Sequence, residues 1–207
     1  LERFTFRGAA AIASVSPEVT ARVEAIAPGS RVVTVGNGFD ESLFAAEGDR
    51  RPATPPYLLY AGTASEVHGA GIFVEAMPHV REQVPDARLV FVGQGADRSE
   101  LEARAARIAP GAVTFLPRAA PRKTAAWIRG ARATLASLRP DGYTAFPTKM
   151  LASLACGTRV VYSGPEPGRS FAAAPGRGWS VDYEPAAVAS AKVAALQSPC
   201  SEDDCVG

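Results

Sequence analysis

Short apolar runs alternate with segments of helical spacing along most of the chain. Beyond residue 56 each run is apolar along nearly its whole length and is followed by a segment in which apolar residues recur every three or four positions. Strands of this kind, each followed by a helix, predict a parallel sheet covered by helices on both faces. We therefore expect a doubly wound α/β domain over about 57–197. The expected strands are 57–62, 87–93, 113–117, 133–138 and 159–163, and the expected helices are 68–84, 97–109, 121–131, 147–156 and 185–197.

The pattern before residue 57 is less regular. An amphipathic helical segment comes first, and a second helix follows, with Ser16 suited to cap it and Pro17 suited to its first turn. An apolar run at 31–35 predicts a strand. The polar, proline-rich segment 45–56 then indicates a domain boundary. A first residue other than methionine, with no capping signal, predicts that the sequence comes from a longer chain.

Composition places the protein among globular domains. The 207 residues are 47% hydrophobic, but no uncharged apolar run is long enough to span a bilayer. Twenty-two basic and twenty-one acidic residues give a net charge of +1, which offers no overall field for nucleic acid or acidic lipid. The start also lacks the basic and apolar regions of a signal peptide. Any anion must therefore be bound locally.

The three cysteines are too few for a disulfide framework. Cys156 lies in an alanine-rich helical segment and is expected in the core. Cys200 and Cys205 lie in a polar tail, where they could close a small loop under oxidation. Two thiols without a nearby histidine are a weak basis for a zinc site. We expect a flexible tail and no metal site.

Ligands of doubly wound sheets bind beyond the carboxyl ends of the strands, in the loops that lead into the helices. Four such loops are GTASEVHG (62–69), GQGAD (93–97), LPRAAP (116–121) and RPDGYTAFPTK (139–149). Glycine lets a ligand approach the backbone closely. Glycine is common at any strand-to-helix turn, but its concentration on this edge favours a pocket. The glycines concerned are Gly62, Gly69, Gly93, Gly95 and Gly142.

These loops contain no familiar nucleotide-binding motif. The glycine loops do not give the G-x-G-x-x-G pattern of dinucleotide binding, and a Walker A loop is absent. Lys149 stands at a helix start after Phe-Pro-Thr, where the helix dipole disfavours a cation. A solvated surface lysine is the alternative, but it gives no reason for this placement. We expect Lys149 to hold phosphate together with the helix amides.

Five segments, in order, resemble the C-terminal, donor-binding half of retaining GT-B glycosyltransferases of family four. They are AIASVSPEVTARV, VVTVGNGFDESLF, YLLYAGTASEVHGAGIFVEAM, PDARLVFVGQGADRSELEARA and LASLACGTRVV. The Pro-Thr-Lys of the last loop is similar to a branch that includes cell-surface polysaccharide and amino-sugar transferases. The resemblance implies a Rossmann-like fold with a remnant of the N-terminal lobe. It divides the chain into the end of that lobe with its hinge (1–50), a nucleotide-sugar-binding domain (51–197) and a tail (198–207).

The resemblance also implies the residues that contact the donor. Lys149 is expected to be catalytic, because it neutralises the diphosphate as the bond to the sugar breaks. The implied substrate-binding residues are Gly62, Thr63 and His68 in the first loop, Gly93 in the second, Arg118 beside the nucleobase, and Tyr143, Thr144, Ala145, Phe146, Thr148, Lys149 and Ala152 around the last loop and its helix. Three of these residues have a structural alternative to substrate binding. His68 could be a structural histidine, Arg118 a solvated arginine, and Phe146 a core phenylalanine.

Four of these positions depart from the family pattern. Two glutamates of the family, one of which binds the donor ribose, fall on Thr144 and Ala152, and an arginine and a lysine that hold the diphosphate fall on Thr63 and His68. A lost charge-assisted hydrogen bond costs roughly 1.5 to 3 kcal/mol. The departures are therefore expected to weaken donor binding without abolishing it.

The implied function is donor binding by a retaining glycosyltransferase of hexosyltransferase type. The donor is a nucleotide-diphospho-sugar, expected to be a UDP-sugar, and the acceptor is a glycan, a lipid-linked molecule or a small molecule. No cofactor, metal, nucleic acid or transmembrane segment is expected. The missing partner is the N-terminal domain, without which we expect no transfer. The expected location is the cytoplasm, with the inner membrane surface as an alternative. A nucleotide-sugar epimerase of the same architecture and a non-catalytic binding or assembly subunit stay open.

Overall fold

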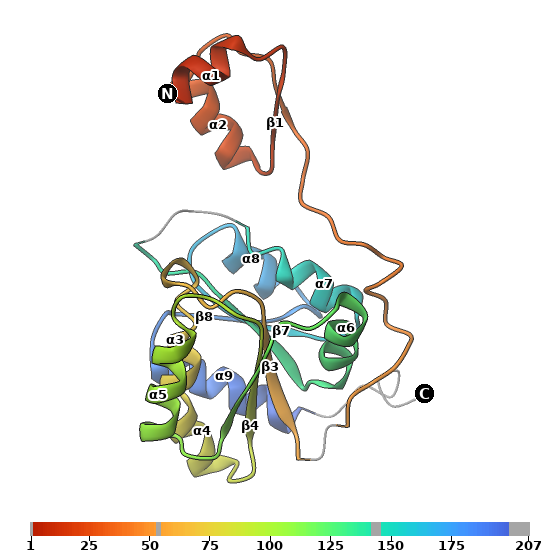
Figure 1. The fold of residues 1–207 in the computed structure, drawn as a ribbon, viewed down its shortest axis with the longest axis vertical. Coiled ribbons are helices and arrows are strands. Elements are labelled where there is room, and N and C mark those ends of the chain that lie inside the picture. Colours follow the sequence, from red (N-terminus) through yellow and green to blue (C-terminus); the bar gives the residue numbers. More distant parts are fainter. Residues whose placement is uncertain (1, 53–54, 142–145, 199–207) are drawn as a thin grey trace. The chain divides into compact units, whose positions relative to one another are not determined.

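The structure is a computed structural model that describes residues 2–52, 55–141 and 146–198, and the chain divides into two compact units, Leu1–Gly38 and Phe39–Gly207 (Figure 1). In the first unit two parallel strands pair beside two helices. The Ser16 side chain accepts a hydrogen bond from the Val19 amide at 3.3 Å, and Pro17 opens the second helix, as the sequence predicts. The elements are α1 (Glu2–Gly8), β1 (Ile12–Ser14), α2 (Pro17–Ile26) and β2 (Val32–Thr34).

The second unit is built on a sheet of six parallel strands. The strands are β3 (Tyr57–Ala61), β4 (Arg88–Val92), β5 (Val113–Leu116), β6 (Ala133–Ser137), β7 (Val160–Ser163) and β8 (Gly178–Val181). Their order across the sheet is β5-β4-β3-β6-β7-β8. The chain first builds outward from β3 through β4 and β5, and then returns to β6 and builds in the opposite direction. This order is that of a doubly wound α/β fold, so the predicted fold class is confirmed.

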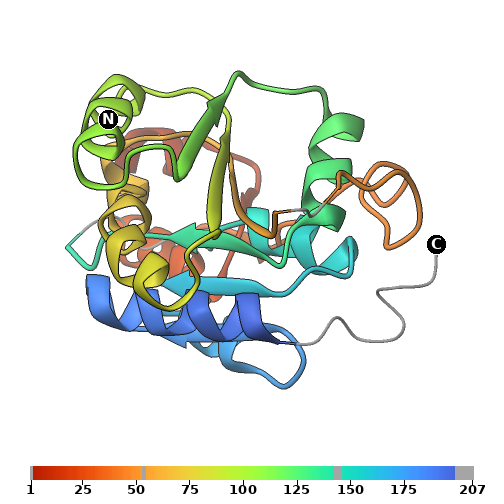
Figure 2. The same cartoon turned by 90° about the horizontal axis from the view of Figure 1, so that it is seen from below.

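Helices cover both faces of this sheet. One face is covered by α3 (Gly71–Glu75), α4 (Met77–Gln83), α5 (Arg98–Ile108) and α9 (Pro185–Gln197), which Figure 2 shows in blue along the sheet. The other face is covered by α6 (Pro121–Gly130), α7 (Lys149–Ala155) and α8 (Gly168–Ala173). No helix among the described residues is both long and apolar enough to cross a bilayer.

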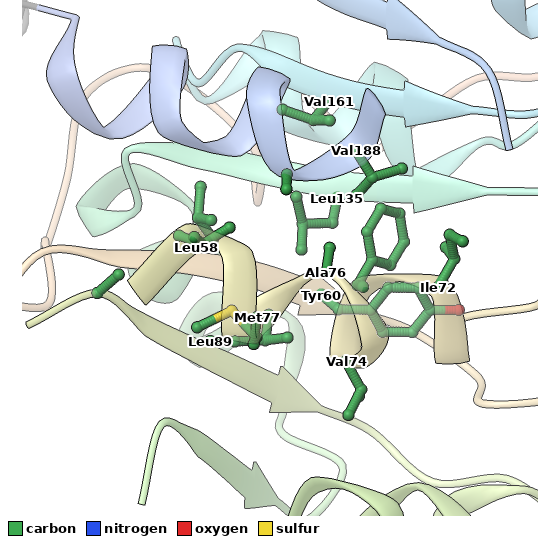
Figure 3. Packing of buried hydrophobic residues seen from close by; sticks show 14 of the residues in the cluster. Leu58, Tyr60, Ile72, Val74, Ala76, Met77, Leu89, Leu135, Val161 and Val188 are labelled. Atoms are coloured by element: carbon green, nitrogen blue, oxygen red, sulfur yellow. The ribbon is translucent and has the colours of Figure 1, made fainter. Parts of the chain in front are cut away.

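Strand residues alternate between these two faces, and both sets are buried. Leu58, Tyr60 and Leu135 point toward α3, α4 and α9 in the main core (Figure 3). Their neighbours Tyr57 and Leu59 point toward α6. Because both faces are covered, the central strands β3, β4, β6 and β7 are apolar along nearly their whole length, which is why the sequence revealed them.

Two parts of the second unit differ from the sequence prediction. The helix expected over 68–84 is divided into a 3-10 turn, η1 (Glu66–His68), followed by α3 and α4, and Pro78 lies in the first turn of α4. Proline has no amide hydrogen, so it fits the start of a helix and interrupts its interior. The other difference is the pair α8 and β8, for which the sequence predicted no element. The four β8 residues are only half-buried, so they lack the continuous apolar run of a central strand.

A segment that we call the strap (residues 39–52) belongs to the second unit, although the sequence assigns most of it to a hinge. The buried Arg129 of α6 fastens the strap by donating hydrogen bonds to the main-chain oxygens of Asp49, at 2.8 Å, and Ala45, at 3.0 Å. From the sequence alone, an arginine near the end of a helix is expected to be a surface charge, but Arg129 is buried. Its guanidinium is compensated by carbonyl groups that lie some eighty residues earlier in the chain.

Candidate functional site

The carboxyl edge of the sheet has one topological switch point, between β3 and β6. Loops that leave adjacent strands in opposite directions diverge there and leave room for a ligand. The loop after β3 contains Gly62, and the loop after β6 leads into α7, which begins at Lys149. The structure brings these two residues together: a β-carbon built on Gly62 would lie 3.1 Å from the Lys149 Nζ.

Tyr60, near the end of β3, holds the Lys149 side chain. The Lys149 Nζ donates a hydrogen bond to the Tyr60 Oη at 2.9 Å and lies 4.1 Å from the centre of the Tyr60 ring. The hydroxyl in turn donates to the main-chain oxygen of Thr63 at 2.8 Å. Burial raises the pKa of Tyr60, so this hydroxyl keeps its proton. The chain of hydrogen bonds fixes the ammonium against the first loop.

Lys149 has a lowered affinity for its proton. Burial lowers the pKa of Lys149 to about 7, because the charged form loses hydration and no carboxylate of the described residues lies within ion-pair distance. A lysine in this condition gains most from an anion, since an anion supplies the missing opposite charge. The electrostatics therefore favour an anionic ligand at the switch point.

His68 ties the same region together. Its Nδ1 lies 2.7 Å from the Ser65 Oγ, and its main-chain oxygen accepts a hydrogen bond from the Ser137 hydroxyl at 2.6 Å. Burial lowers the pKa of His68, and the Lys149 charge lowers it further. The half-buried imidazole therefore stays neutral next to the ammonium, and its main chain joins η1 to the end of β6.

The glycines at this edge serve close packing within the protein. A β-carbon on Gly93 would fall well inside contact distance of the Gly62 main-chain oxygen, and Gly93 has φ +151°. The loops after β3 and β4 lie backbone to backbone, with the Gly62 amide donating to Val92 and the Ala64 amide donating to Gln94, each at 3.0 Å. We expected glycine to admit a ligand to the backbone. At Gly93 the closely approaching group is the neighbouring loop.

Two adjoining hollows lie at this site, one on the carboxyl edge and one between α6, α7 and the sheet. The open one, about 380 Å³, lies among the loops after β3, β4 and β5. The smaller one, about 170 Å³, is mostly apolar, and Lys149 is one of its lining residues. Ala61 and Thr124 line both, so the two hollows adjoin, and among the described residues no Asp or Glu lines either one.

Most of the predicted site residues within the described ranges meet at these hollows. Gly62, Thr63, Gly93 and Arg118 line the open hollow, and Lys149 and Ala152 line the small one. Thr148 is exposed before α7, and its side chain makes no capping hydrogen bond. Three predicted residues, Tyr143, Thr144 and Ala145, lie outside the described residues, as do Cys200 and Cys205.

Phe146 packs as a core phenylalanine, which was the alternative interpretation of this predicted substrate-binding residue. Its ring meets the Phe171 ring edge-on, with centroids 4.9 Å apart, in the cluster around Met150 and Tyr162. It joins α7 to α8.

Among the residues at the site that were not predicted, three have a clear role in its geometry. Tyr60 holds the ammonium, Thr124 lines both hollows, and Phe44 of the strap lines the small hollow. Tyr60 lies within an apolar strand and reads as core, which it also is. Thr124 follows Pro121 in the first turn of α6, a position that could have been considered. Phe44 belongs to the motif GFDESLF, and that motif was its only signal.

Comparison with known proteins gives matches that span most of this chain and part of each relative. Residues 55–198 match the family described as glycosyl transferases group 1. The chain is 30% identical to a phosphatidyl-myo-inositol mannosyltransferase of Mycobacterium tuberculosis over 138 aligned residues. The aligned region covers 65% of this chain and 35% of that protein. The chain therefore spans about a third of that relative.

Solved structures share the fold. The sucrose-phosphate synthase of Thermosynechococcus elongatus matches with a TM-score of 0.76 and 25% identity, over 92% of this chain and half (50%) of that chain. An Anabaena protein, HepE, solved in complex with UDP and glucose, matches with a TM-score of 0.72 and 17% identity, over 94% of this chain and 55% of its own. The latter likeness shows the fold alone.

Proposed function

Since the chain belongs to the family of group 1 glycosyl transferases, we propose that its second unit binds the nucleoside-diphosphate part of a sugar donor, with the diphosphate beside Lys149. The assignment to GT-B glycosyltransferases that the sequence motifs predicted is confirmed. The observation that carries the proposal is an ammonium group at the topological switch point with no carboxylate to neutralise it among the described residues. A diphosphate supplies the charge that this site lacks.

The proposed chemistry is transfer of the sugar with retained configuration. The bond between the anomeric carbon and the diphosphate oxygen breaks and its electron pair leaves on the diphosphate. An acceptor hydroxyl oxygen forms a new bond to the anomeric carbon on the same face, and the hydroxyl proton passes to the leaving diphosphate. Negative charge grows on the leaving oxygen, so a fixed ammonium stabilises the transition state more than the bound donor. In this proposal Lys149 balances the charge and no metal takes part. Transfer also requires an acceptor-binding lobe, which the longer relatives have room for.

The proposed donor is a UDP-sugar and the proposed sugar is a hexose. Several structural relatives support this choice: HepE was solved with UDP and glucose, and a pneumococcal O-GlcNAc transferase with UDP and GlcNAc. The named mannosyltransferase relative supports a hexose but not a particular base. Arg118, which lines the open hollow, is proposed to lie beside the base.

Isothermal titration calorimetry tests the proposal with UDP, GDP, TDP and uridine. We expect Lys149→Ala to weaken binding of the diphosphate by about ten- to a hundredfold, the value of a hydrogen bond to a charged group. Uridine binding should change little, and EDTA should leave the diphosphate affinity unchanged. Lys123→Ala is the matched control, because Lys123 is exposed on α6 and lines neither hollow.

Equal diphosphate affinity of wild type and Lys149→Ala, at low salt and with folding confirmed by circular dichroism, would refute the placement of the donor. Failure of every nucleotide to bind would refute donor binding altogether. That outcome would favour a non-catalytic assembly subunit, which one observation supports: Ala152 lines the Lys149 hollow where the family carries a carboxylate. Conversion of a UDP-sugar without acceptor would favour the epimerase.

A further inference from the structure

We propose that Phe44 and Arg129 are positioning residues for Lys149: Arg129 fastens the strap, and the strap holds the Phe44 ring as a wall that keeps water from the ammonium. The wall is a property of the free protein. Its effect on donor affinity rests on the proposed function. The proposal is carried by the path of the strap, by its anchors and by the lining of the small hollow.

Asp40 shapes the strap locally so that Phe44 faces inward. Its carboxylate accepts hydrogen bonds from the Ser42 amide, at 3.0 Å, and the Ser42 hydroxyl, at 2.6 Å. Its main-chain oxygen accepts from the amides of Leu43, at 3.1 Å, and Phe44, at 2.9 Å. An aspartate that closes a turn in this way orders the residues after it. The half-buried Phe44 ring then packs on the cluster formed by β3, β4 and α6.

The C-terminal part of the strap is fastened to α6 at several points. Besides the two hydrogen bonds from Arg129, the Arg51 amide donates to the Ala126 oxygen at 3.0 Å. The Arg51 guanidinium lies 5.4 Å from the centre of the Trp127 ring. A β-carbon on Gly130 would collide with the Arg51 main-chain oxygen, so this glycine is what allows the close approach. The strap is therefore held against α6 as part of the second unit.

Phe44 shares a hollow or groove with each of two residues proposed to hold the donor, Lys149 and Arg118. It lines the small hollow with Lys149, and it also lines a groove of about 440 Å³ with Arg118 and Thr124. Within residues 2–52, 55–141 and 146–198, the polar groups that interact with the ammonium are the Tyr60 hydroxyl of β3 and, by its charge effect, the His68 imidazole of η1. Neither is a carboxylate. Water exclusion by apolar neighbours such as Phe44 therefore dominates the environment of Lys149.

The test uses the three lysines of the chain, Lys123, Lys149 and Lys192, which give three separate signals in protein labelled with ¹³C at the lysine Cε. Each signal is followed against pH in the full chain without ligand. In Phe44→Ala we expect the Lys149 midpoint to rise by roughly one pH unit or more, because water reaches the ammonium. Arg129→Met should produce a rise in the same direction, because the released strap no longer holds the ring.

Two controls separate a wall from a general loss of structure. Phe39→Ala removes an exposed phenylalanine of the same strap, and Phe44→Leu keeps an apolar group in place, so neither should move the Lys149 midpoint. Lys192 is fully buried in α9, and its signal should keep its midpoint in every variant. An unchanged Lys149 midpoint in both Phe44→Ala and Arg129→Met, or an equal shift of Lys192, would overturn the proposal.

UDP titrations of the same variants then distinguish the two proposals. If UDP binds, its loss of affinity at alkaline pH should begin at higher pH in Phe44→Ala than in Phe39→Ala, since Lys149 stays charged longer. If UDP does not bind to any of them while the lysine midpoint still shifts, the wall stands and the proposed function fails. If UDP binds and the midpoint does not shift, the function stands and the wall fails.

Discussion

Binding of a nucleoside diphosphate should take up a proton. In the free protein burial holds the pKa of Lys149 at about 7, whereas a diphosphate beside the ammonium favours the charged form and raises that pKa. At pH 7 roughly half of the free molecules have a neutral lysine, so we expect an uptake of roughly half a proton per UDP. Well below pH 7 the lysine is charged in both states. As the pH rises through 7, the free protein loses the proton that the complex keeps, and the affinity falls.

The size of this loss of UDP affinity with rising pH follows from the same site. One group that must be charged costs at most about tenfold in affinity per pH unit, since one unit is worth about 1.36 kcal/mol. The total is limited by the value of the contact itself, about 1.5 to 3 kcal/mol, or about ten- to a hundredfold. We therefore expect UDP binding to weaken by that factor between about pH 6 and pH 9.

Calorimetry measures the uptake directly. UDP is titrated at each pH in two buffers that differ in ionisation enthalpy, and the difference in heat gives the number of protons bound. Uridine should show no uptake, and Lys149→Met should abolish the uptake while weakening UDP binding. An affinity that stays constant from pH 6 to pH 9, with no proton taken up in wild type, would refute the idea that Lys149 is the diphosphate ligand.

Three further outcomes follow from buried or crowded residues. Gly93→Ala should lower the free energy of unfolding, measured in urea, by about 2 kcal/mol or more, because the new β-carbon meets Gly62 and the backbone is strained. Gly111→Ala is the control: with φ +70° and open space around it, it should lower the same free energy by only about 1 kcal/mol. The stability of wild type should increase as the pH rises above 7, because burial also lowers the pKa of Lys192 to about 7, so that the unfolded chain binds more protons than the folded one. In urea titrations at pH 7 and pH 9, Lys192→Met should show a smaller increase. Ala152→Glu should tighten uridine binding in calorimetry, because it restores a carboxylate to the hollow that contains Lys149; weaker uridine binding would show that the hollow no longer fits a ribose.

The central strands were predictable because burial on both faces leaves a continuous apolar run, as in β3 and β4. The edge strand β8 was not, since its four half-buried residues carry no such run. Helix α9 was predicted over its full length, whereas the single helix expected over 68–84 is divided, and Pro78 lies in the first turn of α4.

The position of Lys149 at the start of α7 could be predicted, because a lysine at a helix start has an electrostatic meaning in the sequence alone, whereas its role as a diphosphate ligand stays a prediction. Its partners could not. Tyr60 looks like any apolar strand residue, and its hydroxyl acquires a role only when β3 lies beside α7. Arg129 looks like a surface charge until the strap returns to cover it. Such contacts depend on residues far apart in the chain, and local patterns do not report them.

The environment that leaves Lys149 without a carboxylate partner among the described residues also makes its side chain a different kind of reagent. An amine that loses its proton near neutral pH has a free electron pair and acts as a nucleophile. Lys192 has a lowered pKa as well, but it is completely buried and donates to the Phe73 main-chain oxygen at 2.8 Å. Lys149 combines the free electron pair with a hollow beside it. We therefore expect an aldehyde or activated ester that fits this hollow to label Lys149, the residue proposed to hold the diphosphate.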